Sequence, residues 1–308
     1  MPFTLRKPSE GGTVGLDIDG RYLSAAEVDG GRVVRAASQD LPEGLVRDGE
    51  VADGRALGEQ LKRFVADAGL PRTVRLGIAN QQIVVRVIEV PRIEDEQQRD
   101  AAVRFQASEA IAMPLDEAVL DHQVAGYVDA LDGSPRMQVV VVAARRTMVE
   151  SLLEAVKIAG LRAEGVDLDA FALVRTLADD ADGSDSARVF CHLGGVTNLA
   201  IAVGSSCFFT RPLSTVWDEG DAGSRLADEI RISIDYYMTQ PQALPAGQVV
   251  LSGPGSADAE LVQSLGGHLG IPLQVAAPLG QIDASVLSPD EDAHRYTVAT
   301  GLSLGAAA

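Results

Sequence analysis

The pattern of apolar and polar positions predicts three short strands between residues 13 and 38. The segments TVGLDI, YLSAAEV and RVVRAAS are apolar or alternating, and the Asp-Gly pairs between them are typical of tight hairpin turns. Apolar residues then recur at helical spacing over residues 54–70, which predicts an amphipathic helix that ends near Gly69. The segment TVRLGIA predicts a further strand. This order of elements is typical of an α/β domain.

A second copy of the three-strand pattern lies in the second half of the chain. Residues 14–35 align without gaps with residues 189–210, and both segments have the pattern strand, glycine turn, strand, small-residue turn, strand. Identity between the two segments is low, so the hairpin pattern alone also explains the match. A true duplication requires an insertion in the first half, because the first copy is followed by more residues than the second.

The predicted insertion is a small α+β subdomain within the first lobe. Its pattern predicts a strand, a helix over residues 94–111, a strand, a Gly/Pro-rich turn and a strand. An amphipathic helix in RTMVESLLEAVKIAGL follows, and the acidic segment ADDADGSDS is the predicted linker between the lobes. The predicted domains are the first lobe (1–82 and 144–186), the inserted subdomain (83–143) and the second lobe (187–308).

Composition limits the partners and the location that we expect. The chain carries 44 acidic and 26 basic residues, and its formal net charge of −18 repels nucleic acid and favours a basic peptide partner. The longest apolar run, VVVVAA, is far shorter than a membrane span, and MPFTLRKPSE lacks the apolar core of a secretory signal. We therefore expect a cytoplasmic protein without direct membrane insertion. Cys191 and Cys207 are expected to be reduced core thiols.

Common motifs for catalysis and for metal binding are missing from the sequence. It contains no G-x-x-x-x-G-K-[ST] loop, no G-x-S-x-G turn and no complete dinucleotide fingerprint. The four histidines are scattered, and the side chains of Cys191 and His192 would leave a strand on opposite faces. We therefore predict no metal site and no catalytic residue of these types.

Several segments together resemble the actin-like ATPase superfamily. They are VGLDIDGRYLSAAEVDGGRV, VTNLAIAVGSSCFFTRPLS, LSGPGS and the closing ATGLSLG. Within that superfamily the chain resembles the PilM family of type IV pilus assembly proteins, itself similar to the division protein FtsA, and EAIAMPLDEAVLDHQV is the segment most specific to it. The resemblance covers nearly the whole chain. It implies a duplicated two-lobe, actin-like (ribonuclease H-like) α/β fold with a small α+β insertion subdomain in the first lobe.

The resemblance also implies a protein partner. PilM-like proteins bind the N-terminal cytoplasmic tail of the bitopic membrane protein PilN in a groove between the first lobe and the inserted subdomain. Such tails commonly carry basic residues, which suit a net charge of −18. The implied location is cytoplasmic, at the inner membrane face, where PilN and other pilus platform components hold the protein. The candidate partner-binding residues are Phe105, Glu109, Ile111 and Met113.

These candidates have a second explanation. Phe105, Ile111 and Met113 are most simply explained as core residues of the inserted subdomain, although an aromatic residue and a methionine are also typical of a peptide-binding slot.

The resemblance further implies a nucleotide site, formed by the two glycine turns and by LSGPGS. The residues that it assigns to binding ATP with Mg²⁺ are Asp17, Asp19, Gly20, Gly194, Gly195, Thr197, Asn198, Gly253 and Gly255.

Three replacements in the phosphate loops depart from the family pattern. Asp19 stands in place of a glycine, Ser24 in place of a lysine, and His192 in place of the aspartate that positions Mg²⁺. A carboxylate about 4 Å from a phosphate oxygen repels it by ~4 kcal/mol at an effective dielectric near 20, which is roughly a thousandfold loss in affinity. We therefore expect a degenerate pocket with weak or absent ATP hydrolysis. The alternative is a divalent cation shared by Asp17 and Asp19, which would let ATP and Mg²⁺ bind.

Two other functions stay open as alternatives to a pilus or secretion-platform scaffold. The first is an active ATPase or small-molecule kinase of the same superfamily, which needs a catalytic aspartate where His192 stands. The second is an FtsA-like division protein. Such proteins usually end in an amphipathic membrane-targeting helix, and ATGLSLGAAA offers no basic, bulky apolar face.

Overall fold

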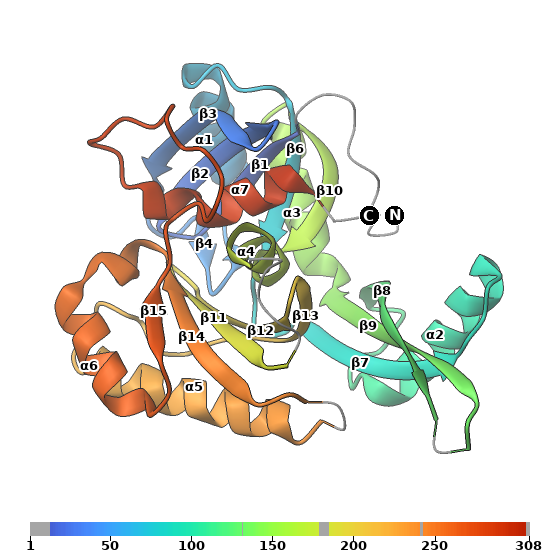
Figure 1. The fold of residues 1–308 in the computed structure, drawn as a ribbon. Coiled ribbons are helices and arrows are strands. Elements are labelled where there is room, and N and C mark those ends of the chain that lie inside the picture. Colours follow the sequence, from blue (N-terminus) through green and yellow to red (C-terminus); the bar gives the residue numbers. More distant parts are fainter. Residues whose placement is uncertain (1–12, 131, 179–184, 241–242, 306–308) are drawn as a thin grey trace. The chain divides into compact units, whose positions relative to one another are not determined.

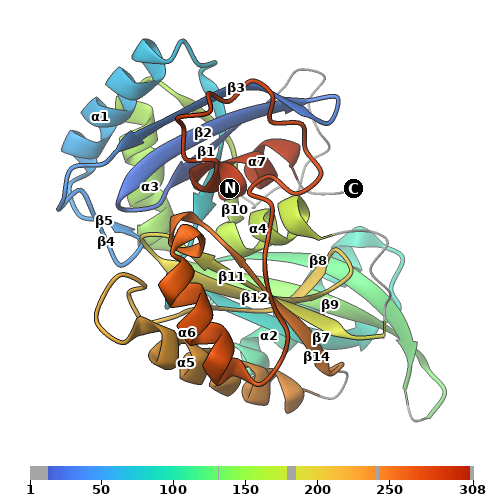
Figure 2. The ribbon, with the colours of Figure 1, turned by 60° about the vertical axis from the view of Figure 1, so that its left-hand side comes forward.

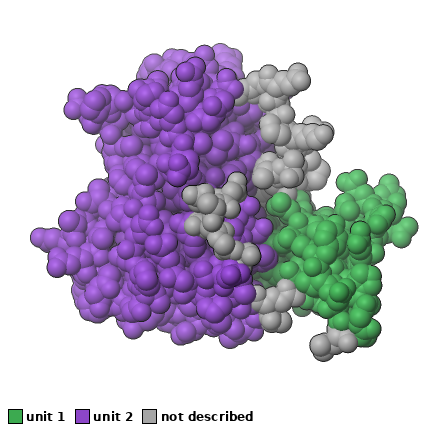
Figure 3. Space-filling view, viewed as in Figure 1, with its two compact units in different colours: residues 1–4, 81–151 green, residues 5–80, 152–308 purple. Residues whose placement is uncertain are grey.

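The computed structural model describes residues 13–130, 132–178, 185–240 and 243–305. It divides into two compact units, of which unit 1 comprises residues 1–4 and 81–151 and unit 2 comprises residues 5–80 and 152–308 (Figure 3). Most of the predicted interlobe linker lies outside the described residues. Within the described ranges, no helix is long and apolar enough to cross a membrane.

Unit 2 contains two five-stranded sheets. The strands of the first sheet are β1 (Val14–Ile18), β2 (Tyr22–Asp29), β3 (Arg32–Asp40), β6 (Thr73–Ile78) and β10 (Arg162–Leu168). The strands of the second are β11 (Ala187–Leu193), β12 (Thr197–Val203), β13 (Ser206–Pro212), β14 (Ala246–Ser252) and β15 (Leu273–Val275). A short hairpin, β4 (Val46–Arg47) and β5 (Glu50–Val51), follows the first three strands.

The two sheets have the same strand order. The first sheet has the order β10-β6-β1-β2-β3, and the second has the order β15-β14-β11-β12-β13. In each sheet an antiparallel three-strand meander is extended by two parallel strands. Residues 14–35 and 189–210, the predicted internal repeat, lie in the matching meanders. The duplication is therefore confirmed at the level of the fold, as the hairpin turns and strand lengths predicted.

The helices of unit 2 cover these sheets and separate them (Figures 1 and 2). α4 and α7 lie between the two sheets, where Leu173 and Val174 of α4 pack against Phe190 of the second sheet. α5 and α6 pack on the other face of the second sheet through residues such as Leu226 and Leu265. The helices are α1 (Gly54–Asp67), α4 (Asp169–Leu177), α5 (Ala222–Met238), α6 (Ala259–Leu269) and α7 (Thr297–Leu304), with the 3-10 helices η1 (Pro254–Ala257) and η2 (Ala293–Tyr296). The chain passes from unit 1 to unit 2 within α3 (Arg146–Ile158).

Both cysteines lie in the core of unit 2. Cys191 and Cys207 are buried and free, and burial raises the pKa of each thiol to about 12. The prediction of reduced core thiols is confirmed.

Helix α7 needs small residues because it contacts backbone on two sides. A Cβ on Gly15 of β1 would come within 1.9 Å of the Ala299 carbonyl oxygen of α7, and a Cβ on Gly301 would come equally close to the Ala172 carbonyl oxygen of α4. Real Cβ atoms do not approach backbone oxygen this closely, so α4 and β1 can lie at these distances only because glycine stands at both positions.

We predict opposite effects for two glycine-to-alanine changes in helices. Gly301→Ala should lower the free energy of unfolding by about 1–3 kcal/mol, because α7 must move away from α4. Gly267→Ala in α6 is the matched control. Its Cβ would meet nothing within 4 Å, so alanine should raise the free energy of unfolding by about 0.5–1 kcal/mol. Urea unfolding followed by circular dichroism measures both. Equal losses in the two variants would contradict this packing.

Unit 1 is a three-stranded antiparallel sheet with one helix on one face. The sheet has the order β7-β9-β8, with β7 at Val84–Pro91, β8 at Ala118–Asp129 and β9 at Pro135–Arg145. Helix α2 (Glu96–Ala110) packs on it through Val103 and Ala107, which contact the apolar core formed with Val139 and Val141. Asp95 caps the helix by accepting from the Gln98 N–H, so α2 begins two residues later than predicted. The predicted order of strand, helix, strand and strand is confirmed.

Candidate functional site

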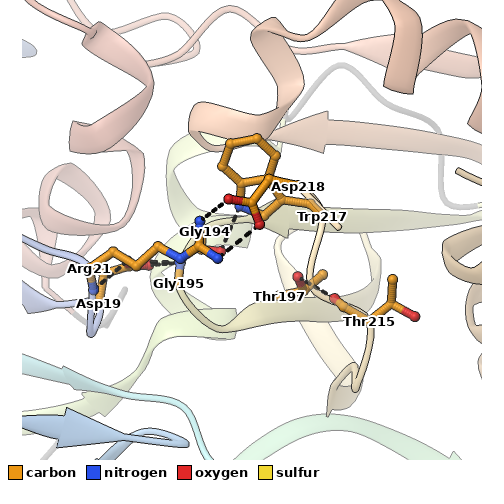
Figure 4. Close-up of polar contacts among 8 residues, drawn as sticks. All are labelled: Asp19, Arg21, Gly194, Gly195, Thr197, Thr215, Trp217 and Asp218. Carbon is orange, nitrogen blue, oxygen red and sulfur yellow. Dashed lines mark hydrogen bonds and ion pairs between the residues drawn. The ribbon is translucent and has the colours of Figure 1, made fainter. Parts of the chain in front are cut away.

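The glycine turns of the two lobes of unit 2 meet at Asp19. Asp19 follows β1, and Gly195 lies in the turn between β11 and β12. The N–H of Gly195 donates to both oxygens of the Asp19 carboxylate, at 2.8 Å to Oδ1 and 2.7 Å to Oδ2 (Figure 4). The N–H of Arg21 also donates to Oδ1, at 3.3 Å. Asp19 is only 7% exposed, so this contact lies away from solvent.

Glycine is required on the second-lobe side of this contact. A Cβ on Gly194 would lie 2.3 Å from Asp19 Oδ2, and a Cβ on Gly195 would lie 2.4 Å from Asp19 Oδ1. On the first-lobe side, Gly20 has a φ of +102°, a backbone conformation that residues with a side chain rarely adopt. The glycines that the family pattern uses near phosphate therefore surround a carboxylate of the chain itself.

An ion pair joins the two lobes at the solvent-exposed edge of the same junction. The guanidinium of Arg21 donates to both carboxylate oxygens of Asp218, at 2.7 and 2.9 Å (Figure 4). It also lies 5.5 Å from the ring centre of Trp217, the chain's single tryptophan. Trp217 Nε1 donates to the Gly194 carbonyl oxygen at 2.9 Å. A Cβ on Gly255 would lie within 2.6 Å of the Trp217 ring, so the indole covers the LSGPGS turn.

Two further carboxylates lie near Asp19, the buried Asp17 and the half-buried Asp169. Asp17 is 2% exposed, and its Oδ2 has no hydrogen-bond partner among the described residues. Oδ1 of Asp169, the first residue of α4, is likewise inaccessible and without a partner in the described ranges. Burial and the charge of Asp169 raise the pKa of Asp17 well above its ordinary value. These two oxygens would suit a cation, but the described residues contain no group of three or more His, Cys, Asp or Glu side chains that could hold a metal ion.

The same burial raises the pKa values of the other two carboxyls. Burial, with a smaller effect from Asp19 and Asp167, raises the pKa of Asp169 to about 8. Burial also raises the pKa of Asp19 to about 6, although the N–H groups of Gly195 and Arg21 stabilise its ionised form. Asp169 therefore tends to be protonated at neutral pH while Asp19 is ionised.

His192 is neutral at the position where the family pattern has an aspartate. It is buried on β11, its Nδ1 lies 3.0 Å from Ser252 Oγ, and burial lowers its pKa to about 4, with a smaller effect from His294. Its Nε2 has no hydrogen-bond partner among the described residues. A neutral imidazole offers no charge to a hydrated Mg²⁺ ion.

The structure distributes the predicted nucleotide residues between two environments. Asp19 lies against Gly194 and Gly195 at the junction, with Gly20 next to it in the same turn and Asp17 at the end of β1. The remaining four make contacts within the second lobe: Thr197 Oγ1 donates to the Thr215 carbonyl oxygen, Asn198 accepts from Thr210, a Cβ on Gly253 would meet the Leu193 backbone, and Gly255 contacts Trp217.

An ATP phosphate group does not fit this arrangement. The Gly195 N–H, which a phosphate oxygen would need, already donates to Asp19. Arg21, whose charge acts on Asp19, is paired with Asp218. Ser24, at the position of the family's lysine, is fully buried on β2 opposite Asp17 and brings no positive charge. We therefore derive no reaction step through a nucleotide.

Sequence reasoning missed four residues of this junction: Arg21, Asp169, Trp217 and Asp218. A signal was available for Asp169, since VDLD ends a strand with two acidic residues just as LDID does. Trp217 was also conspicuous as the only tryptophan of the chain. The pairing of Arg21 with Asp218 had no local signal, because the two residues are 197 positions apart.

The candidate partner-binding residues of unit 1 lie in different environments. Phe105 of α2 is 66% exposed, so its interpretation as a core residue is wrong. Glu109 is also exposed and accepts a hydrogen bond from Gln106. Ile111 is only 4% exposed and belongs to the unit 1 core, against which the half-buried Met113 packs. The side chains available to a partner are therefore those of Phe105 and Glu109.

A family model and several solved structures match this chain. The family model described as type IV pilus assembly protein PilM matches residues 15–203. The solved PilM-PilN type IV pilus biogenesis complex aligns with a TM-score of 0.80 at 24% identity, covering 96% of this chain and 98% of that one.

More distant structures share the fold. The cytoplasmic domain of EpsL, an inner membrane component of the type II secretion system of Vibrio cholerae, aligns with a TM-score of 0.52 at 13% identity, covering 95% of this chain and 94% of that one. ADP-bound MreB5 of Spiroplasma citri aligns with a TM-score of 0.51 at 10% identity, covering 96% of each chain. These likenesses show an actin-like two-lobe fold.

Proposed function

The chain belongs to the PilM family of type IV pilus assembly proteins, and we propose that it is a scaffold of an inner-membrane assembly platform. In this proposal it binds the N-terminal cytoplasmic tail of a PilN-like membrane protein and neither needs nor hydrolyses ATP. The proposal also covers platforms of related secretion machines. It locates the protein in the cytoplasm, at the inner membrane face, where the PilN-like protein and other platform components hold it.

The observation that carries the proposal is the contact between Asp19 and Gly195. The chain's own carboxylate occupies the N–H that an ATP phosphate would use. A phosphate brought within about 4 Å of that carboxylate would be repelled by ~4 kcal/mol. Ser24, at the position of the family's lysine, brings no charge to offset the repulsion. A protein with this pocket keeps the rigid two-lobe fold of an ATPase and offers it as a surface for assembly.

Charge and exposed side chains support the choice of partner. The solved relative with the highest similarity reported above is a complex of PilM with PilN. The net charge of −18 attracts a basic tail over a long range and speeds its association. On unit 1, Phe105 supplies an exposed aromatic ring and Glu109 a carboxylate one helical turn away on the same helix. An aromatic anchor beside an acidic group suits a peptide with mixed apolar and basic residues.

The second candidate function is an active ATPase or kinase, which one observation favours. The unpartnered oxygens of Asp17 and Asp169 are oxygen ligands of the kind that Mg²⁺ prefers. Against it stand the neutral His192 and the engaged Gly195 N–H. An FtsA-like function has less support, because the family model that matches residues 15–203 is that of the type IV pilus assembly protein PilM.

Peptide titration tests the proposed partner. A synthetic peptide with the N-terminal tail sequence of the PilN-like protein from the same genome should bind the wild type in calorimetry. Phe105→Ala should weaken binding about tenfold, because the peptide loses its aromatic anchor. Tyr236→Ala is the matched control, since Tyr236 is also an exposed aromatic residue on a helix but belongs to unit 2. We expect it to bind like the wild type.

Two results would count against this assignment. If the wild type gave no heat with the tail peptide, the partner would be wrong. If Phe105→Ala and Tyr236→Ala weakened binding equally, the contact surface would not be α2. Thermal unfolding of each variant checks that it is folded before the titration.

A further inference from the structure

The two lobes of unit 2 are joined at the glycine turns by side chains of the chain itself. We use the name interlobe clasp for Asp19, Arg21, Gly195, Trp217 and Asp218. Asp19 and Arg21 come from the first lobe, and the other three come from the second. Figure 4 shows the hydrogen bonds of Asp19 and of Arg21 directed to different residues of the second lobe. The clasp therefore has an inner and an outer contact.

The inner contact places an anion where a glycine turn offers a donor. The N–H of Gly195 donates to a carboxylate that is 7% exposed, and a hydrogen bond to an ionised acceptor is stronger than one between neutral groups. Turns with a free backbone N–H are common binding sites for phosphate and other anions. Asp19 thus fills, from within the chain, the position that a bound anion would take.

The Arg21 guanidinium in the outer contact has more partners than the cation of a simple surface ion pair. Both oxygens of Asp218 accept from the Arg21 guanidinium, in a fork-to-fork geometry. The ring of Trp217 contacts the guanidinium from a second direction, and Trp217 Nε1 donates a hydrogen bond to the Gly194 carbonyl oxygen. Since Arg21 is restrained by two partners, forming the pair costs less side-chain entropy. The side chains of Arg21 and Asp218 are still 40% and 43% exposed, so salt will weaken this contact more than the inner one.

We propose that the interlobe clasp holds the two lobes of unit 2 closed without a nucleotide, with Asp19 in the place of a phosphate and Arg21 with Asp218 closing the outer edge. This inference rests on the closed nucleotide site of the proposed function and adds a mechanism to it. In proteins that close two domains around a ligand, the ligand bridges the domains. Here the bridge is covalently part of the chain, so the closed conformation does not depend on ATP concentration.

Amide hydrogen exchange tests whether the clasp keeps the two lobes closed. In Asp218→Ala, amide exchange in the segment 194–198 should rise about tenfold, because the lobes open more often once the outer contact is lost. Fluorescence of Trp217, the only tryptophan, should become easier to quench with acrylamide in the same variant. Asp228→Ala is the matched control. It breaks the exposed pair between Asp228 and Arg231, which lies within α5 of the second lobe, and should change neither measurement.

The inner contact has its own variant. Asp19→Asn keeps the size of the side chain and removes its charge, and we expect faster exchange of the Gly195 amide, by about tenfold. If Asp19→Asn did not fold, the exposed Asp218→Ala would still decide the proposal.

The possible results test the clasp and the proposed function separately. Unchanged exchange and quenching in Asp218→Ala would overturn the clasp and leave the scaffold assignment intact, since peptide binding tests that independently. Protection of residues 194–198 in the wild type on addition of Mg·ATP would overturn both the clasp and the closed nucleotide site. Faster exchange in the clasp variants, with no effect of Mg·ATP on the wild type, is the expected result.

Discussion

Replacing Asp19 with glycine and His192 with aspartate should raise the affinity for Mg·ATP by roughly a thousandfold. The first change removes the carboxylate that accepts from the Gly195 N–H, and the second restores the acidic residue of the family pattern. Isothermal titration calorimetry with Mg·ATP measures the gain. We expect no detectable heat for the wild type and micromolar binding for the double variant.

The control for this variant removes a carboxylate of the same lobe that lies away from the junction. Asp29→Gly removes an exposed carboxylate at the end of β2, in the same lobe as Asp19. It should leave ATP affinity at the wild-type level. If the double variant bound ATP no better than Asp29→Gly, then Asp19 and His192 would not be what excludes the nucleotide.

Asp169→Asn should lower the dependence of the free energy of unfolding on pH, although the raised pKa values of Asp17 and Asp19 leave part of it in place. The pKa of Asp169 is raised to about 8 by burial, above its ordinary value of 3.8, so the folded state binds its proton more tightly than the unfolded state. A raised carboxyl pKa contributes stability that is present at low pH and is lost as pH rises through the folded value. From pH 5 to pH 8 this group alone should lower the free energy of unfolding by about 3 kcal/mol. Asparagine cannot ionise, so the variant should not show that loss.

Urea unfolding at pH 5 and at pH 8 measures this difference. His192 has the opposite sign, because its lowered pKa costs stability as pH falls, but that cost is the same in wild type and variant and cancels. Asp67→Asn serves as control, since Asp67 is exposed at the end of α1 and its carboxyl stays in water on folding. Parallel pH dependences for the wild type and Asp169→Asn would show that Asp169 is not buried as described.

The fold was predictable because its signals are local. Asp-Gly turns fixed the hairpins, and small residues at the end of the chain matched a helix packed between two sheets. The repeat could be seen from the same turns, since residues 14–35 and 189–210 form matching meanders.

The interpretation of Phe105 as a core residue was wrong for a physical reason. The helix packs on unit 1 through a narrow stripe that contains Val103 and Ala107, and Phe105 lies between them in sequence on the opposite side.

The candidate site was predictable only in part. The sequence was enough to predict that Asp19 and His192 are unfavourable for phosphate and Mg²⁺, because that prediction needs only charge and a family pattern. It could not show that Asp19 has a new partner in Gly195, or that Arg21 pairs with Asp218. Both contacts depend on how the two lobes close, and no periodicity or spacing reports on residues so far apart in the chain.

The central claim is that the protein binds its partner without help from nucleotide. The most direct test is a calorimetric titration of the PilN-like tail peptide into the wild-type protein, with and without saturating Mg·ATP. The proposal predicts the same dissociation constant in both titrations, because the chain's own carboxylate already engages the Gly195 N–H. A tenfold change in peptide affinity on adding Mg·ATP would contradict it, since two ligands can be coupled only if both bind.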